Sequence, residues 1–231
     1  MSSERPLLSV IMPVFNEKDT VREILRRVRN TPHEKEIIIV DDFSTDGTRE
    51  ILREVKGEDV RVLFHEQNMG KGAAIRTAQS HVRGEIAIIQ DADLEYDPAD
   101  YDVLLQPILE GFADVVYGSR FIGGPHRVLL FWHRLGNTLL TFFSNMLTNL
   151  DLTDMETGYK AIRSEVFKKI RIKSNRFGIE PELTAKLARM KVRIFETSIS
   201  YRGRSYSEGK KITWRDGVAA FCHILRYRFF D

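Results

Sequence analysis

Three carboxylate side chains at alternate positions follow one short apolar run near the middle of the chain. Ile86–Ile89 is apolar and short enough to be a buried strand rather than a helix. Asp91, Asp93 and Glu95 come directly after it, and in an extended chain residues at this spacing point to the same side. A divalent cation such as Mg²⁺ or Mn²⁺ would relieve their mutual repulsion and could hold substrate phosphates. The alternative is a solvated acidic loop in which Asp93 or Asp97 caps a helix.

The segments around this stretch alternate between strand and helix patterns. The sequence predicts buried strands over residues 7–14, 36–40, 60–64, 86–89 and 113–117, with amphipathic helical patterns between them. Such alternation is typical of βαβ units, and so of an α/β fold with a mostly parallel central sheet and flanking helices. Ligands bind such sheets beyond the carboxyl ends of the strands, where residues 13–17, 41–42 and 91–95 and Arg120 are expected.

A lysine between two glycines marks the start of another helix. Gly70, Lys71 and Gly72 precede the apolar helical pattern of residues 73–78. Backbone N–H groups at a helix N-terminus, together with a lysine, suit a phosphate. The pattern matches neither common nucleotide-binding motif, and a tight turn without a ligand explains the glycines equally well.

The second half of the chain is rich in apolar and aromatic residues. Residues 127–150 and 212–231 are candidate helices that carry several phenylalanines, two tryptophans and a few arginines. One interpretation is core helices, and the other is helices that lie on a membrane surface. Because no repeat or linker interrupts the sequence, we expect a single domain over residues 1–231.

Composition limits the classes of function. The chain has 231 residues, of which 42% are hydrophobic and 29% charged, as in ordinary globular proteins, and its net charge of +2 does not favour a nucleic-acid partner. The one cysteine, Cys222, excludes an intrachain disulfide framework and fits a reducing cytoplasm. Neither a signal peptide nor a transmembrane helix is expected, because Pro13 interrupts the first apolar run and no run of about 18 apolar residues follows.

An ordered set of motifs resembles the inverting family 2 glycosyltransferases. From about residue 7 to about residue 226 the chain contains VIMPVFNE, IIIVDDFSTDGT, NMGKGAA, QDADLEYDP, GSRF, DMETGYKAI and GRSYSEGKK, in the order of that family. The set is most similar to polyprenyl-phosphate hexose synthases of the dolichol-phosphate mannose synthase kind. The resemblance implies the GT-A fold of nucleotide-diphospho-sugar transferases, a Mg²⁺ or Mn²⁺ ion, and attachment to the cytoplasmic face of a membrane.

The resemblance also implies roles for individual residues. Contacts to the nucleotide sugar are expected from Pro13, Phe15, Glu17, Val40, Asp42, Asp91, Ala92, Asp93, Arg120, Arg204 and Lys210. The metal ligands are expected to be Asp91, Asp93 and Glu95, although Glu95 stands where mannose synthases usually carry glutamine. The expected catalytic residues are Asp93, Arg120 and Arg134, of which the arginines match those that meet the acceptor phosphate. Arg204 and Lys210 fit a basic loop that closes over the diphosphate.

The implied reaction is transfer of a hexose, with mannose favoured, from a nucleotide sugar (GDP-mannose or a UDP-hexose) to a polyprenyl or dolichyl phosphate. A lipid phosphate needs positioning more than deprotonation. A glycan hydroxyl acceptor would instead need a carboxylate base, for which Asp154 and Glu182 are candidates. The remaining alternatives are a transferase that uses UDP-glucose or another UDP-sugar, and a silent nucleotide-sugar-binding protein.

Overall fold

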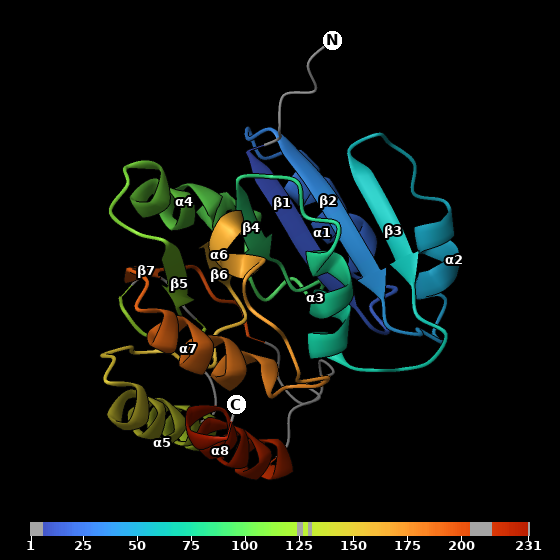
Figure 1. Cartoon of the computed structure of the whole chain (residues 1–231). Coiled ribbons are helices and arrows are strands. Elements are labelled where there is room, and N and C mark those ends of the chain that lie inside the picture. The colour runs from blue at the N-terminus through green and yellow to red at the C-terminus, as the bar shows by residue number, and fades with distance from the viewer. Residues whose placement is uncertain (1–6, 124–126, 129–130, 204–213, 231) are drawn as a thin grey trace.

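The computed structural model of the protein describes residues 7–123, 127–128, 131–203 and 214–230. Within these residues one sheet contains seven strands in the order β3-β2-β1-β4-β6-β5-β7 (Figure 1). The strands are β1 (Leu8–Val14), β2 (Lys35–Asp41), β3 (Val60–Phe64), β4 (Ile86–Ile89), β5 (Val115–Ser119), β6 (Lys160–Arg163) and β7 (Ile194–Ser198). Of these described strands, β6 alone runs antiparallel to its neighbours, so the predicted mostly parallel α/β sheet is confirmed.

Helices cover both faces of the sheet. They are α1 (Val21–Arg29), α2 (Thr48–Arg53), α3 (Lys71–Gln79), α4 (Tyr101–Leu109), α5 (Phe131–Thr148), α6 (Ser164–Phe167), α7 (Ile179–Met190) and α8 (Trp214–Phe229), with a short 3₁₀ helix, η1 (Pro98–Asp100), before α4. Val10 and Met12 of β1 pack with α1 and α4, whereas Ile11 between them packs with α3 and α7 on the opposite face. Because side chains alternate along a strand and both faces are covered, most residues of the central strands are apolar and buried.

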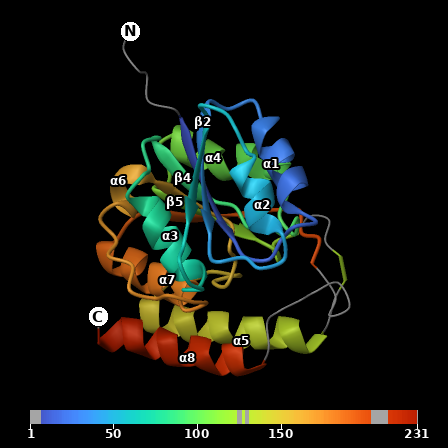
Figure 2. The ribbon, with the colours of Figure 1, turned by 90° about the vertical axis from the view of Figure 1, so that its right-hand side faces the viewer.

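Helices α5 and α8 form a further layer outside α7. They lie side by side in both views of the molecule (Figures 1 and 2), and the rings of Phe143 and Phe221 join them with centroids 5.3 Å apart. The helical patterns predicted for 127–150 and 212–231 are therefore present as 131–148 and 214–229 in the described part of the chain.

Strand β6 was not predicted. The pattern of residues 160–163 does not indicate a strand, because only the two middle residues, Ala161 and Ile162, are apolar. In the structure Lys160 is almost fully buried, and its ammonium group donates hydrogen bonds to the carbonyl oxygens of Met155 and Thr157. Arg163 donates to the carbonyl oxygen of Ile108 at 2.6 Å. Tertiary hydrogen bonds thus satisfy charges that the sequence pattern alone would place in solvent.

Candidate active site

The predicted ligand-binding edge of the sheet is present. Strands β1, β2 and β4 are parallel, and β5 runs in the same direction because β6 is antiparallel to both β4 and β5. Their carboxyl ends therefore lead to Phe15, Asp42, Asp91 and Arg120 on one side of the sheet. This edge is where open α/β sheets bind ligands.

The segment after β4 turns instead of continuing the strand, so the extended geometry predicted for its three carboxylates was wrong. Leu94 has a left-handed φ of 64°, and Oδ1 of Asp93 accepts a hydrogen bond of 3.1 Å from the backbone N–H of Glu95. An aspartate that bonds the backbone two residues on favours such a turn. The carboxylate of Glu95 accepts a hydrogen bond of 2.9 Å from the hydroxyl of Tyr201. The role of Glu95 as a metal ligand stays a prediction.

Lys71 forms an ion pair with two carboxylates. Its ammonium nitrogen lies 2.9 Å from Asp91 and 3.1 Å from Glu180 of α7. Burial by itself would lower the pKa of Lys71, but the charges of Asp91 and Glu180 outweigh it and hold that pKa well above its usual value. Lys71 is therefore a permanent cation beside the predicted metal site. The sequence did not predict this ion pair, and contact of Lys71 with a phosphate stays a prediction.

Gly158 lies directly against this ion pair. A Cβ atom at this position would be 2.5 Å from Oδ2 of Asp91 and 2.9 Å from the ammonium nitrogen of Lys71. The backbone N–H of Gly158 donates a hydrogen bond of 3.1 Å to the hydroxyl of Tyr96, whose ring stacks on Tyr159. The close approach leaves room only for glycine.

The carboxylate of Asp42 holds the loop that leads to α3. It accepts hydrogen bonds from the backbone N–H groups of Met69 at 2.8 Å and Gly70 at 2.6 Å, and from the side-chain amide of Asn68 at 3.0 Å. The ring of His65 contacts the same carboxylate at 2.8 Å. Asp42 is buried and in this structure positions the loop before Lys71. Its predicted contact with the nucleotide stays a prediction.

The other residues predicted to bind the nucleoside surround the same strand ends. Val40 and Ala92 are buried, Pro13 is partly buried, and the ring of Phe15 is 37% exposed and accessible for stacking. The carboxylate of Glu17 accepts a hydrogen bond of 2.8 Å from the hydroxyl of Thr20. Arg204 and Lys210 lie outside the described residues.

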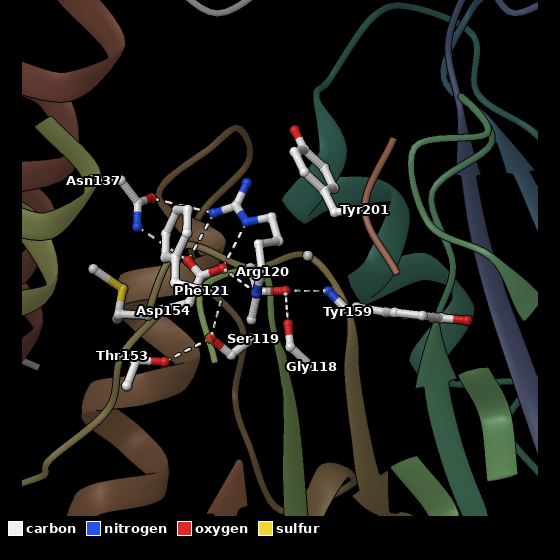
Figure 3. A network of polar contacts seen from close by, with 12 residues as sticks. Gly118, Ser119, Arg120, Phe121, Asn137, Thr153, Asp154, Tyr159 and Tyr201 are labelled. Carbon is white, nitrogen blue, oxygen red and sulfur yellow. Dashed lines mark hydrogen bonds and ion pairs between the residues drawn. The ribbon is translucent and has the colours of Figure 1, made fainter. Parts of the chain in front are cut away.

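Arg120 forms a two-point ion pair with Asp154 (Figure 3). Nε lies 2.6 Å from Oδ2 and Nη2 lies 2.7 Å from Oδ1 of that carboxylate. Burial would raise the pKa of Asp154, but Arg120 outweighs it and holds this pKa below its usual value. Burial would likewise lower the pKa of Arg120, which Asp154 raises well above its usual value. The remaining terminal nitrogen, Nη1, has no hydrogen bond to any residue that the structure describes, and no dashed line reaches it in Figure 3.

Arg134 approaches Arg120 through a shared aromatic ring. The guanidinium carbon of Arg134 on α5 lies 4.6 Å from the ring centroid of Phe121, and that of Arg120 lies 5.4 Å from the same centroid. Arg134 is exposed, whereas Arg120 is largely buried. The two predicted phosphate-binding arginines are therefore brought together, one fixed by Asp154 and one at the surface.

The segment between Asp154 and Gly158 carries a further titratable group. Burial and the nearby Glu180 carboxylate raise the pKa of Glu156 to about 8. Among the described residues, its Oε1 is buried without a hydrogen-bond partner. Because its pKa lies above 7, Glu156 keeps a proton at neutral pH. Burial also lowers the pKa of Lys160 to about 8.

The carboxylates at this edge of the sheet suit a metal ion whose ligands come partly from the protein and partly from the substrate. Within the described ranges, no three histidine, cysteine or carboxylate side chains are grouped so as to hold a metal ion. Mg²⁺ is commonly bound through one or two carboxylates together with substrate phosphates. Asp91 and Asp93 provide oxygen ligands of this kind, with diphosphate oxygens as the remaining ligands. Their role as metal ligands stays a prediction.

Comparisons with known proteins agree with this geometry. Residues 9–171 match the family described as glycosyl transferase family 2. Glycosyltransferase AglJ of Haloferax volcanii is 28% identical over 219 residues, which cover 94% of this chain and 70% of that protein. A dolichol-phosphate mannosyltransferase of Pyrococcus furiosus is 29% identical over 213 residues, which cover 89% of this chain and 60% of that protein. The crystal structure of glucosyl-3-phosphoglycerate synthase of Mycobacterium tuberculosis with Mn²⁺, UDP and phosphoglyceric acid is 18% identical, with a TM-score of 0.75 over 98% of this chain and 80% of that one.

The fold is the GT-A fold of the nucleotide-diphospho-sugar transferases. The chain belongs to glycosyltransferase family 2, and it is an enzyme of that family. Its sequence is similar to transferases named for polyprenyl phosphates, as the motif order predicted.

Sequence reasoning assigned no role to three residues at this site. Gly158, Glu156 and Glu180 lie in motifs that were recognised, but their types and spacing did not predict the ion pair of Lys71. Gly158 lies two residues before β6, and because that strand was not predicted, no local signal identified this glycine. The pairing of Glu180 with Lys71 joins distant parts of the chain, and no local pattern predicts it.

Proposed function

We propose that this enzyme transfers a hexose from a nucleotide sugar to a polyprenyl phosphate of the dolichyl type, with inversion at the anomeric carbon. The observation that carries the proposal is the arginine pair at the ring of Phe121. Arg120 has a terminal nitrogen that no described residue uses, and Arg134 is exposed on α5. Arginine side chains suit phosphate groups, and the outer face of α5 is apolar. A binding site for a lipid phosphate needs both the arginines for the phosphate and an apolar surface for the lipid chain.

The donor half of the site lies at the end of β4. Asp91 and Asp93 would hold Mg²⁺ or Mn²⁺ together with the diphosphate of the nucleotide sugar. When bound, the ion would stabilise the negative charge of the departing nucleoside diphosphate. Lys71, fixed beside Asp91 at 2.9 Å, adds a positive charge at the same place. The exposed ring of Phe15 would stack on the base.

The acceptor half needs no base. A phosphate monoester is ionised near neutral pH and is already a nucleophile, so the residues around it must position it. The carboxylate of Asp154 is committed to Arg120. Glu182 accepts hydrogen bonds from the backbone N–H groups of Lys173 and Ser174, at 2.7 Å and 2.6 Å. These contacts argue against either carboxylate as the base that a glycan hydroxyl acceptor would require.

The outer faces of α5 and α8 support attachment to a membrane surface. Large apolar side chains recur at helical spacing on both helices and are exposed: Leu135, Leu139, Phe142 and Met146 on α5, and Val218, Phe221, Leu225 and Phe229 on α8. Arg226 and Arg228 lie in the last turn of α8, and long basic side chains of this kind can reach lipid headgroups while their stems contact apolar surface. We infer peripheral binding at the cytoplasmic face of a membrane. In the part of the chain that the structure describes, none of the helices combines the length and the apolar character required to span a bilayer.

The donor we favour is GDP-mannose, which matches the mannosyltransferase name of the Pyrococcus furiosus relative. A UDP-hexose is the alternative, because the solved M. tuberculosis structure contains UDP. A silent nucleotide-sugar-binding protein would not need the arginine pair at Phe121.

The test is an incubation of the purified enzyme with labelled GDP-mannose or UDP-glucose, a short-chain polyprenyl phosphate in detergent micelles, and Mg²⁺ or Mn²⁺. We expect label in the organic phase from one donor, and none when acceptor is omitted or EDTA is added. Transfer of label to a glycan hydroxyl acceptor but not to the lipid would overturn the acceptor assignment. Binding of nucleotide sugar without any transfer would favour the silent protein.

A further inference from the structure

Helix α5 faces the domain with polar side chains as well as with Leu140 and Leu147. The hydroxyl of Thr141 accepts a hydrogen bond of 3.2 Å from the backbone N–H of Met155. The amide of Asn145 donates to the carbonyl oxygen of Leu152 at 2.7 Å and accepts from its N–H at 3.1 Å. Residues at this spacing share one face of a helix, so Thr141 and Asn145 form a polar stripe on α5. This polar stripe holds the loop of residues 152–155 through hydrogen bonds. That loop carries Asp154, the partner of Arg120.

Asn137 lies on the same face of α5, one turn before Thr141, and contacts the Arg120–Asp154 ion pair directly (Figure 3). Its Oδ1 accepts a hydrogen bond of 3.2 Å from Nη2 of Arg120, and its Nδ2 donates one of 3.1 Å to Oδ1 of Asp154. The orientation of the amide follows from chemistry, because a guanidinium can only donate and a carboxylate can only accept. A side-chain amide is therefore suited to bind both partners at once.

We propose that Asn137 is a positioning residue for the acceptor phosphate, which it affects through Arg120. Asn137 and Asp154 together hold Nε and Nη2 of Arg120, so that Nη1 remains directed toward the acceptor. The inference rests on the proposed function, since it assigns the free nitrogen of Arg120 to a lipid phosphate. Asn137 lies three residues after Arg134 on α5, so one helix supplies both the exposed arginine and the amide that orients the buried one.

The contacts around Arg120 explain why an amide is needed in addition to Asp154. The guanidinium carbon also lies 5.3 Å from the ring centroid of Tyr201 and 5.4 Å from that of Phe121. Without Asn137, Nη2 loses one acceptor and Asp154 loses one donor, while the two rings continue to attract the cation. Among the described residues, the guanidinium is then held in place by hydrogen bonds to Asp154 alone, and the direction of Nη1 is less tightly fixed.

The test compares Asn137→Ala with Asn145→Ala in the full-length enzyme. Asn145→Ala removes two hydrogen bonds between α5 and the loop but none to Arg120. Three constants are measured: the dissociation constant of a short-chain prenyl phosphate in micelles, the KM for the acceptor and the KM for the donor. We expect Asn137→Ala to raise the acceptor Kd and KM by about 10-fold, as for loss of a hydrogen bond to a charged group, with the donor KM unchanged. Asn145→Ala should leave the acceptor constants within about twofold of wild type, because the backbone N–H of Asp154 stays bonded to Glu196 at 3.1 Å and the Arg120 contacts are intact.

Asn137→Asp provides a second test, because it adds a carboxylate that competes for Arg120. It should weaken acceptor binding more than Asn137→Ala. Equal acceptor constants for Asn137→Ala and Asn145→Ala would overturn the inference, and so would a common loss of donor and acceptor affinity. If wild type binds the prenyl phosphate but transfers no sugar, the proposed reaction is wrong. The positioning role is then decided by the binding constants alone.

Discussion

The ammonium group of Lys71 and the carboxylate of Asp91 are held 2.9 Å apart at the end of β4, with the Cα atom of Gly158 packed against both. This relationship joins three motifs that are far apart in the sequence. It places a permanent positive charge where the diphosphate of a nucleotide sugar is proposed to bind. The geometry tolerates little change, because no side chain fits between Gly158 and the ion pair.

Substitution of Gly158 by alanine should therefore disrupt the site. The added Cβ would lie 2.5 Å from Asp91 and 2.9 Å from Lys71, so one of these groups must move. We expect the free energy of unfolding to fall by about 1–3 kcal/mol, as in other overpacked sites, and donor affinity to fall with it. Urea unfolding and binding of the nucleoside diphosphate measure the two effects.

The matched control is Gly136→Ala in α5, where an added Cβ meets nothing within 4 Å. This change should raise the free energy of unfolding by about 0.5–1 kcal/mol, because alanine favours a helix over glycine. If both alanine variants lost stability to the same extent, the close packing at Gly158 would not be the cause.

Asp93→Asn should reduce turnover by about a hundredfold or more, since it removes a charged ligand from the proposed metal site. Titration of Mn²⁺ in the presence of nucleoside diphosphate should show weaker metal binding at the same time. Asp102→Asn is the control, because Asp102 is an exposed carboxylate on α4 that pairs with His33. Full activity of Asp93→Asn would show that the metal assignment is wrong.

Glu156 predicts a dependence of stability on pH. The folded protein keeps a proton on Glu156 up to about pH 8, whereas the unfolded chain releases it near the usual value of 4.5. Between these values the folded state binds more protons, so the contribution of Glu156 to the free energy of unfolding falls as pH rises. Glu156→Gln cannot ionise and should gain stability relative to wild type between about pH 5 and about pH 8.

Thermal unfolding at several pH values measures this difference. The control is Glu110→Gln at the end of α4, where the side chain is exposed. A constant difference between Glu156→Gln and wild type across this range would contradict the assignment of a retained proton to Glu156.

Membrane binding should depend on the outer face of α5. Phe142 and Phe112 are each 60% exposed, but Phe142 lies on α5 and Phe112 follows α4. We expect Phe142→Asp to lower the partition coefficient onto anionic phospholipid vesicles by about tenfold, the amount expected for one large apolar side chain, and Phe112→Asp to leave it unchanged. Sedimentation with the vesicles gives the bound fraction. Equal effects of the two variants would refute attachment through α5 and α8.

The central part of the fold could be predicted from the sequence because the apolar pattern of each segment agrees with the strand or helix that it forms. The runs that became β1 and β2 are mostly apolar, and the predicted ranges 7–14 and 36–40 lie within one residue of the observed strands at each end. Strand β6 could not be predicted, because its charged ends are satisfied by carbonyl groups from other segments. The position of Glu95 also escaped prediction, because a left-handed Leu94 turns the chain after β4.

The residues of the site that lie directly at the ends of strands could be predicted from the sequence. Asp91 and Arg120 lie where the parallel sheet places them. The partners of these residues could not be predicted: Lys71 and Asp154 reach them from other parts of the chain. Helix α5 shows the same limit. Its apolar pattern was compatible with a core helix, and the structure divides that pattern: Leu140 and Leu147 face the domain beside the polar stripe, whereas Leu139 and Phe142 are exposed.

The most direct measurement of the proposed reaction is the anomeric configuration of its lipid product. The enzyme is incubated with a nucleotide sugar of known α configuration and a short-chain polyprenyl phosphate, and the product is analysed by NMR. Direct displacement by the lipid phosphate predicts a sugar linked to that phosphate in the β configuration. A product that retains the α configuration, or sugar that is never found on the lipid phosphate, would contradict the proposed reaction.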